Sequence, residues 1–217
     1  MKIQVKKNIL ASNASVAFQN RERLQRHGVT MVNLMASPGA GKTSAIVKAI
    51  QLAPQLRIAV IEGDIASEID SLVIEAMGVT ALQINTGGSC HLTAGMITSA
   101  LNYLSLSDLD LIVIENVGNL VCPAEFDLGE AARVMIASVA EGDDKPLKYP
   151  LMFRQVDAVL LNKIDLLPHC DFDLPAFRDT VAALNPAAPI LELSCKDGSG
   201  TADWSAWLTR TAAVMAD

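Results

Sequence analysis

The sequence predicts an α/β fold, with a doubly wound and mostly parallel sheet flanked by helices. Short apolar runs alternate with helical stretches from Thr30 onward, and the run Leu111–Glu115 holds three β-branched residues in succession. A Gly-rich segment follows the first apolar run, as in folds that bind a ligand at the carboxyl ends of their strands. Hydrophobic residues make up 51% and aromatic residues 4%, which suits a core of buried parallel strands.

Each strand is predicted from a short apolar run, and each helix from a longer amphipathic stretch. The strands are expected at Met31–Ala36, Ile58–Ile61, Ala81–Ile84, Leu111–Glu115, Val134–Val139, Ala158–Leu161 and Ile190–Leu193. The helices between them are expected at Lys42–Leu52, Leu92–Leu104, Phe172–Leu184 and Asp203–Val214. Residues 12–27 predict a polar helix that Ser12 begins and Gly28 ends. We therefore expect an N-terminal extension with a short helix (1–29), one α/β domain (30–217) and an exposed polar loop at residues 141–149.

The charge balance and the cysteine content exclude several classes of protein. The formal net charge is -7 with a pI of about 4.9, so a nucleic-acid-binding surface is not expected. No apolar run reaches the roughly 18 residues of a membrane helix, and no secretory leader is visible. The four cysteines are too scattered for a disulfide scaffold, and we expect free thiols or metal ligands in a reducing compartment. These properties favour a cytoplasmic protein that binds neither nucleic acid nor a membrane.

A phosphate-binding loop is predicted directly after the first strand. Residues 36–43 read Ala-Ser-Pro-Gly-Ala-Gly-Lys-Thr, which matches G-x-x-x-x-G-K-[ST] except at Ala36. The glycines let backbone N–H groups face phosphates, Lys42 reaches the terminal phosphates, and Thr43 offers a hydroxyl to Mg²⁺. A turn without a ligand would have no use for Lys and Thr after a glycine. The nucleotide contacts expected here come from Pro38, Gly39, Ala40, Gly41, Lys42, Thr43 and Ser44.

The base is predicted from a second motif, Asn162-Lys163-Ile164-Asp165, which follows an apolar strand. It resembles the guanine-specifying N-K-x-D motif of GTPases. A carboxylate at Asp165 accepts from two guanine N–H groups that adenine does not present as a pair, a difference of about 1–3 kcal/mol. Ser194-Cys195-Lys196 resembles the S-A-K loop on the other side of guanine, with Cys195 as a small residue or a packed thiol. Residues 30–217 are thus expected to be a P-loop GTPase domain that binds GTP and GDP.

Two acids end predicted strands near the phosphate loop. Asp64 and Glu115 are suited to hold Mg²⁺ directly or through water, and we assign Lys42, Asp64 and Glu115 as the catalytic residues. Both acids could instead be solvated strand ends. Residues 115–118, Glu-Asn-Val-Gly, have the spacing of a switch loop whose glycine N–H senses the γ-phosphate. No Arg finger or catalytic Gln stands out, which predicts slow hydrolysis. The less favoured acids for the same roles are Glu62 and Asp70.

A candidate transition-metal site lies between the two nucleotide motifs. Cys90-His91 begins a predicted helix and Cys122-Pro123 follows the switch loop, so both lie after strands at the nucleotide edge. Two thiolates and an imidazole suit Zn²⁺ or Ni²⁺. Three ligands leave the site incomplete, and a two-fold dimer could complete it by pooling two sets. Residue chemistry alone leaves simple packing of these thiols open. The remaining candidates are surface histidines, His27 and His169, and the unassigned Cys170.

With these residues assembled, the sequence resembles the HypB family, GTPases of the SIMIBI class that serve nickel insertion into [NiFe]-hydrogenase. The resemblance covers nearly all of Thr30 to Trp207, and the run Glu115–Pro123 is its most diagnostic part. The related UreG GTPase has a similar phosphate loop but places its metal-binding Cys and His together around a Pro. The resemblance implies slow, Mg²⁺-dependent GTP hydrolysis, a GTP-favoured homodimer, and Ni²⁺ or Zn²⁺ at the interface on the residues matching Cys90, His91 and Cys122. It also implies nickel transfer between a HypA-type partner and the hydrogenase large-subunit precursor.

Two features depart from the family pattern. Residues 1–29 contain no cysteine and only one histidine, so a Cys-rich or His-rich nickel store is not expected there. Thr93 stands where an acidic residue commonly follows the Cys-His-Leu segment.

Three functional hypotheses follow from these motifs. In the favoured one, GTP and Mg²⁺ fix the loops after Asp64 and Glu115, and nucleotide state changes metal affinity or dimer contacts. Lys145 and Lys148 could reach a nucleotide across that dimer. A second hypothesis makes the metal a structural Zn²⁺ in a GTP-regulated binding protein. A third is an ATP-driven partition-type nucleotidase, which would remove the role of Asp165.

Overall fold

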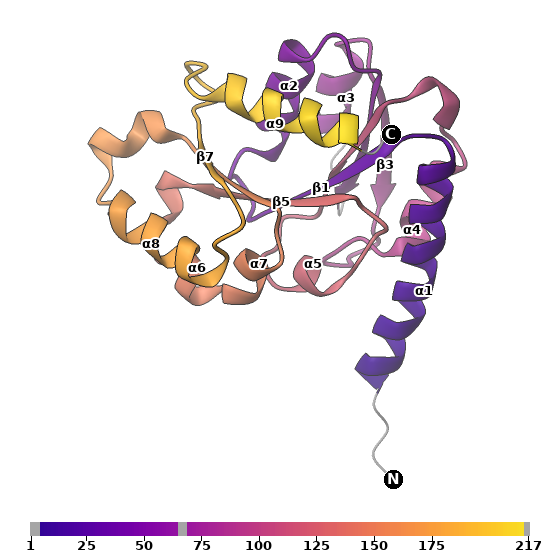
Figure 1. The fold of residues 1–217 in the computed structure, drawn as a ribbon, viewed down its shortest axis with the longest axis horizontal. Coiled ribbons are helices and arrows are strands. Elements are labelled where there is room, and N and C mark those ends of the chain that lie inside the picture. Colours follow the sequence, from indigo (N-terminus) through magenta and orange to yellow (C-terminus); the bar gives the residue numbers. More distant parts are fainter. Residues whose placement is uncertain (1–4, 65–68, 215–217) are drawn as a thin grey trace.

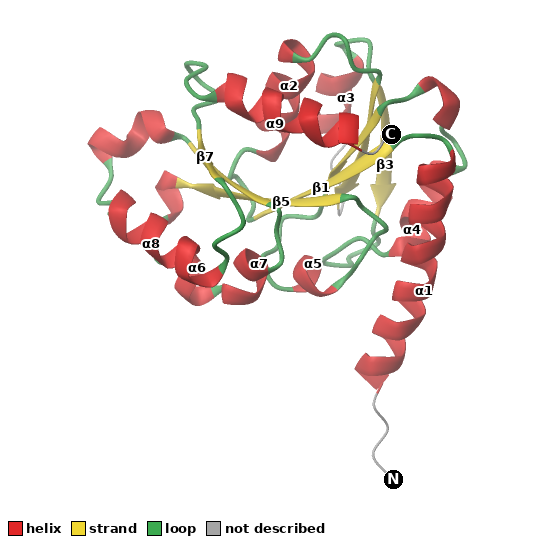
Figure 2. Ribbon diagram, viewed as in Figure 1, coloured by secondary structure: helices red, strands yellow, loops and turns green. Residues whose placement is uncertain are grey.

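The computed structural model describes residues 5–64 and 69–214, and its centre is a single sheet with helices on both faces (Figures 1 and 2). Within the described residues the sheet has seven strands, which are β1 (Thr30–Ala36), β2 (Ile58–Asp64), β3 (Thr80–Asn85), β4 (Leu111–Glu115), β5 (Ala132–Ser138), β6 (Ala158–Asn162) and β7 (Ile190–Glu192). Every pairing is parallel, in the order β3-β2-β4-β1-β5-β6-β7. The predicted fold class is confirmed.

Two helical layers cover this sheet. One layer holds α2 (Lys42–Leu52), α3 (Ile69–Glu75) and α9 (Thr201–Val214), which lie together above the sheet in Figure 1. The other layer holds α1 (Val5–Arg26), α4 (Ala94–Leu101), α5 (Cys122–Glu125), α6 (Lys145–Lys148), α7 (Pro150–Arg154) and α8 (Leu174–Leu184). Short 3₁₀ turns complete the chain at η1 (Leu106–Asp108), η2 (Val139–Glu141) and η3 (Ile164–His169).

Buried aliphatic side chains fill both sides of the sheet, as the low aromatic content predicts. Trp204 of α9 is the largest fully buried side chain, and its indole N–H donates to the carbonyl oxygen of Ala45 in α2 at 3.0 Å. That bond satisfies the one polar group which the indole takes into the core. Along the described chain, no helix combines the length and the apolar composition needed to cross a membrane.

The N-terminal helix is longer than the sequence predicts. The predicted helix covers residues 12–27, whereas α1 runs for 22 residues from Val5 to Arg26. Ser12 is therefore inside the helix and does not cap it, because residues 5–11 contain no Gly or Pro to stop it. Polar side chains fix α1 to the body: Asn13 donates to the Asp127 carbonyl oxygen at 2.6 Å and accepts from the Ala94 N–H at 2.8 Å.

Other elements also differ from their predicted form or extent. The helix predicted at residues 92–104 spans only Ala94–Leu101, because the Thr93 hydroxyl caps it by accepting from the Met96 N–H at 3.4 Å. The prediction of an exposed loop at residues 141–149 is wrong. This segment begins with the last residue of η2 and contains the whole of α6, in which Pro146 is buried. Helix α3 is not predicted, because its run Leu-Val-Ile favours a strand when periodicity alone is read.

Candidate functional site

The loops that carry the predicted motifs all follow strands, so they meet at the carboxyl edge of the sheet. The phosphate loop follows the central strand β1, the Cys90 loop follows β3, and the Glu115 loop follows β4. The base motif follows β6, and the Ser194 loop follows β7. The central strand β1 lies between β4 and β5, the place where strand order reverses and where such sheets bind their ligands.

The phosphate loop has the backbone conformation that its glycines permit. Gly39 has φ 76° and Gly41 has φ 102°, both in the left-handed region that favours glycine. A Cβ at Gly41 would also collide with the side-chain nitrogen of Asn162. Gly41 is the residue before α2, so the free N–H groups at the N-terminus of that helix lie at this loop, an arrangement that favours anions.

Lys42, Thr43 and Glu115 lie together beside this loop. The Thr43 hydroxyl donates to Glu115 Oε1 at 3.0 Å, and the Lys42 ammonium lies 3.9 Å from the same oxygen. The side chains of Lys42 and Glu115 are largely buried, which strengthens their electrostatic interaction. A hydroxyl and a carboxylate oxygen this close are the hard ligands that Mg²⁺ prefers.

Asp64 occupies the last position of β2, on the same edge of the sheet. Strand β2 pairs with β4 so that Glu62 stands opposite Glu115, and Asp64 lies two residues beyond that pair. Glu62 is buried within the sheet, whereas Asp64 is partly exposed at its edge. The side chain of Asp70, a less favoured alternative, lies outside the described residues.

The predicted switch loop touches the phosphate loop through backbone atoms. A Cβ at Gly118 would lie 3.0 Å from the backbone nitrogen of Pro38 and 2.9 Å from its Cγ. Only a glycine allows this approach without displacement of the phosphate loop. The segment that follows Glu115 is therefore in direct contact with the loop expected to hold the phosphates.

The base motif lines a cavity of about 300 Å³ next to the phosphate loop. The Asp165 carboxylate accepts from the Ser194 hydroxyl at 2.7 Å and lies 3.9 Å from the Lys196 ammonium. Asn162 donates to the Ala40 carbonyl oxygen at 2.9 Å, which ties the base motif to the phosphate loop. The full lining is Gly41, Ser44, Asn162, Lys163, Asp165, Leu166, Cys195 and Lys196.

Cys195 is a packed thiol in this lining. Burial raises its pKa to about 11, so the thiol stays protonated at neutral pH. The thiol therefore acts here as a small, weakly polar wall of the cavity.

Cys90, His91 and Cys122 form one cluster, as the metal-site hypothesis requires. Their ligand atoms all lie within 4.8 Å of one another, with the two sulfurs 3.0 Å apart and Cys90 Sγ 3.6 Å from His91 Nδ1. Cys90 is exposed, while His91 and Cys122 are half-buried. Two loops from different strands thus bring soft ligands together at a surface that a partner can reach.

The protonation of this cluster follows from its surroundings. Burial lowers the pKa of His91, only partly offset by the charge of Glu125, so its imidazole is neutral at neutral pH. The hydrogen bond from Cys90 and burial raise the pKa of Cys122. The His91 ring packs on Phe126, with ring centroids 3.9 Å apart, which restricts its orientation.

Glu141 and Asn119 are site neighbours that the sequence does not single out. Glu141 accepts from the Ser37 hydroxyl at the start of the phosphate loop, and its Oε2 accepts from the Ser138 N–H at 3.1 Å. Burial raises the pKa of Glu141, against the charge of Lys145 3.8 Å away. Asn119 donates to the Cys90 carbonyl oxygen at 3.2 Å. Asn119 lies within the diagnostic run Glu115–Pro123, where the sequence assigns it no role, and for Glu141 only the polar composition of residues 141–149 indicates a contact.

The remaining candidates have other partners. Lys145 pairs with Glu141, and Lys148 pairs with Asp144 on the surface of α6. The exposed His27 follows the end of α1 and hydrogen-bonds through its ring to the Arg23 carbonyl oxygen of that helix. Cys170 packs against a hydrophobic core cluster that includes Phe177 and Val181 of α8.

Comparison with known proteins places these features in a family. Residues 30–192 match the family described as the CobW/HypB/UreG nucleotide-binding domain. The Hydrogenase maturation factor HypB of Azotobacter chroococcum mcd 1 is 48% identical over 96% of this chain and 68% of its own length. HypB from Helicobacter pylori, solved in complex with nickel, superposes with a TM-score of 0.90 at 37% identity, covering 94% of this chain and 96% of its own. The Hydrogenase Maturation Factor HypB from Archaeoglobus fulgidus superposes with a TM-score of 0.88 at 39% identity, over 93% and 99% of the two chains. The chain belongs to the HypB family, within the wider group that shares the CobW/HypB/UreG nucleotide-binding domain.

Proposed function

We propose that this protein binds and hydrolyses GTP, and that its nucleotide state controls the binding and transfer of nickel during [NiFe]-hydrogenase maturation. The observation that carries the proposal is the cluster of Cys90, His91 and Cys122, whose ligand atoms lie within 4.8 Å of one another. The loops that hold this cluster also hold Glu115 and Gly118, which contact the phosphate loop. The nucleotide and the metal therefore bear on the same segment of chain.

Guanine specificity is assigned to Asp165. Its carboxylate lies in the cavity wall with oxygens already aligned by Ser194 and Lys196. Guanine offers it two N–H donors, and adenine would leave it unpaired at a cost of about 1–3 kcal/mol. The Asn162 and Lys163 side chains hold the base motif against the phosphate loop, so base and phosphates bind to one rigid unit.

Lys42, Thr43, Asp64 and Glu115 are assigned to the phosphate end. Thr43 and Glu115 present the oxygen ligands for Mg²⁺, with Asp64 directly or through water; a bound Mg²⁺ would neutralise charge on the β- and γ-phosphates. Lys42 leads from the first turn of α2 toward the phosphates, and the N–H groups around Gly39 and Gly41 complete the cradle. Catalytic power remains modest because no Arg finger or catalytic Gln is identified in the sequence.

Nickel is the cargo in this proposal, and Zn²⁺ is the competing ion. Two thiolates and a neutral imidazole fit either ion, and three ligands leave at least one position open. An open position on an exposed cluster suits a metal that must leave again, whereas a structural zinc site is normally closed. We infer that a second copy of the chain completes the site in a homodimer that GTP favours.

The partners are inferred from the relatives. Proteins named as hydrogenase maturation factors match this chain over most of its length. We therefore propose a HypA-type nickel donor and the large-subunit precursor of a [NiFe]-hydrogenase as acceptor, in the cytoplasm, without nucleic acid or membrane partners. The net charge of -7 supports exclusion of nucleic acid.

Two assays test this function. The first measures hydrolysis of GTP and of ATP with Mg²⁺, and we expect slow turnover of GTP only. The second titrates nickel and follows the thiolate-to-nickel charge-transfer band in wild type, in Cys122→Ala and in Cys170→Ala. The band and the stoichiometry should fall in Cys122→Ala alone, because Cys170 lies in a separate packed cluster. Equal nickel binding by Cys122→Ala and wild type, or a preference for ATP, would contradict the assignment.

A further inference from the structure

A buried chain of hydrogen bonds leads from the metal-site loop into the sheet. The Leu92 N–H, next to His91, donates to the Asn116 side-chain oxygen at 3.2 Å. The Asn116 side-chain nitrogen donates to the Asn33 side-chain oxygen at 3.2 Å, and Asn33 donates in turn to Glu130 Oε1 at 3.3 Å. Asn33 and Asn116 are 0% and 1% exposed, so water does not compete for these groups.

We call this chain of hydrogen bonds, from Leu92 through Asn116 and Asn33 to Glu130, the relay. The donor and acceptor chemistry of its groups fixes the direction of every bond. Asn116 receives the backbone N–H groups of Leu92 and of Val117, the latter at 2.9 Å, and backbone N–H groups only donate. Its amide must therefore turn its oxygen toward them and its nitrogen toward Asn33. Asn33 must then accept on its side-chain oxygen and donate from its side-chain nitrogen to the Glu130 carboxylate, where the relay ends.

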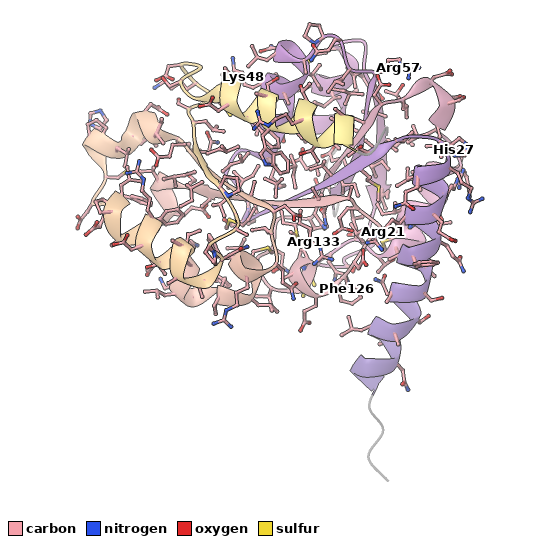
Figure 3. The ribbon with its side chains drawn as sticks, in the orientation of Figure 1. Arg21, His27, Lys48, Arg57, Phe126 and Arg133 are labelled. Atoms are coloured by element: carbon pink, nitrogen blue, oxygen red, sulfur yellow. The ribbon has the colours of Figure 1, made fainter. Side chains whose placement is uncertain are left out.

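The carboxylate at the end of the relay is firmly held. Glu130 Oε1 accepts from Arg133 Nε at 2.7 Å, and Oε2 accepts from the Leu128 N–H at 2.6 Å. Figure 3 shows Arg133 on β5 and Arg21 on α1, and Arg21 donates to the Glu130 carbonyl oxygen at 3.4 Å. The relay thus has a charged, immobile anchor at one end and the metal loop at the other.

In the sequence, Asn116 lies between two residues that contact the phosphate-loop region. Glu115, directly before it, accepts from the Thr43 hydroxyl. Gly118, two residues after it, lies against Pro38. Leu92 is packed against Gly63, the residue before Asp64, since a Cβ there would lie 2.7 Å from Leu92 Cγ. A shift of the 115–118 segment therefore reaches Leu92 through Asn116.

We propose that Asn116 is the positioning residue that transmits nucleotide state to the metal site, by setting Cys90 and His91 relative to Cys122. The inference rests on the proposed function and names its route of regulation. Asn116 connects the two halves of the cluster. It belongs to the segment that leads from β4 to Cys122, and its side-chain oxygen accepts from the N–H of Leu92, the residue after His91. The exposed bond from Asn119 to the Cys90 carbonyl oxygen adds a second tie at the surface.

The test compares nickel dissociation constants with GDP and with a non-hydrolysable GTP analogue. Wild type should differ between the two states by at least about fivefold, within the usual range of allosteric coupling. Asn116→Ala should bring that ratio to within about twofold of unity, with a matching loss of the state-dependent change in the nickel–thiolate band. Asn185→Ala is the matched control, because it removes two amide bonds, to the Phe153 and Val156 carbonyl oxygens, from a site remote from the metal loops.

Thermal unfolding and GDP affinity of each variant show that it is folded. If Asn116→Ala does not fold, Asn33→Ser carries the same prediction one step deeper in the relay, and an unchanged ratio in it overturns the inference. A wild-type ratio preserved in Asn116→Ala overturns the role of Asn116 and leaves the proposed function intact. Equal nickel affinities in wild type would instead contradict the proposed function, and the inference with it.

Discussion

The Lys163 ammonium donates to the carbonyl oxygen of Gly39 at 2.7 Å, joining two motifs that lie 124 residues apart in the chain. Lys163 has φ 63° and ψ 37°, and it is the one non-glycine residue with positive φ in the described part of the chain. Such a conformation costs about 1 kcal/mol or more, and it persists where the surrounding structure fixes it. The base motif and the phosphate loop are thus already assembled into one binding surface.

Lys163→Ala should weaken binding of GDP and GTP alike by about 10-fold to 100-fold. A hydrogen bond that involves a charged group contributes about 1.5–3 kcal/mol, and the phosphate loop loses this restraint. Binding of a fluorescent guanine nucleotide measures the effect. Arg57→Ala is the control, since it removes another cation, paired with Asp110 at 2.6 Å, from the opposite edge of the sheet. Unchanged affinity in Lys163→Ala would show that the restraint has no part in binding.

Asp165→Asn should change base preference from guanine toward xanthine. The introduced side-chain amide would not accept from both guanine N–H groups, but it would donate to the additional oxygen of xanthine. A binding free energy of about 1–3 kcal/mol would then favour xanthine in place of guanine. Competition among GTP, XTP and ATP measures this. Asp197→Asn, an exposed carboxylate nearby that accepts from the Ser199 N–H, should leave base preference unaltered. Equal losses for GTP and XTP in Asp165→Asn would argue against direct base contact.

Gly118→Ala should impair binding of GTP more than binding of GDP. The added methyl group would lie 3.0 Å from the Pro38 backbone nitrogen, so the switch loop or the phosphate loop must move. In the proposed function, the γ-phosphate contacts both loops. Gly95→Ala, whose new Cβ would have only the Thr93 hydroxyl nearby at 3.9 Å, should bind both nucleotides normally. A Gly118→Ala protein with the wild-type ratio of GTP to GDP affinity would remove the switch assignment.

Cys195 should react slowly with iodoacetamide, and the rate should rise with pH. Because burial raises its pKa to about 11, only roughly one thiol in a thousand is ionised at pH 8. The rate should therefore increase about tenfold per pH unit up to that pKa, and bound GDP should reduce it further because Cys195 lines the cavity. Peptide mapping by mass spectrometry follows this cysteine. Labelling at pH 8 as fast as that of an ordinary exposed cysteine would contradict the assignment.

The sheet was predictable because parallel buried strands leave short apolar runs in the sequence. Leu111–Glu115 and Lys42–Leu52 have the boundaries that the sequence predicts. The expected start of α1 at Ser12 is wrong, because residues 5–11 contain no Gly or Pro that would keep the helix from beginning earlier. The contacts of Asn13 with Asp127 and Ala94, which hold this helix on the body, could not be predicted because they join residues far apart in the sequence.

The candidate site shows the same division. Lys42 and Asp165 were predictable as candidates because each belongs to a motif of distinctive chemistry at fixed spacing. Glu141 and Asn33 were not, since a lone acid and a lone amide acquire meaning only from the neighbours that the fold supplies. The clustering of Cys90 with Cys122 was predictable from the rule that parallel strands share a carboxyl edge, and the family resemblance implies the same residues.

The central claim is that nucleotide state controls the metal site, and nickel affinity tests it most directly. The dissociation constant for Ni²⁺ is measured on the wild-type protein with GDP and Mg²⁺, and again with a non-hydrolysable GTP analogue and Mg²⁺. We predict values that differ by at least about fivefold, with a reciprocal effect of nickel on nucleotide affinity. Equal nickel affinities in the two states would contradict the account and leave the cluster of Cys90, His91 and Cys122 as a structural metal site.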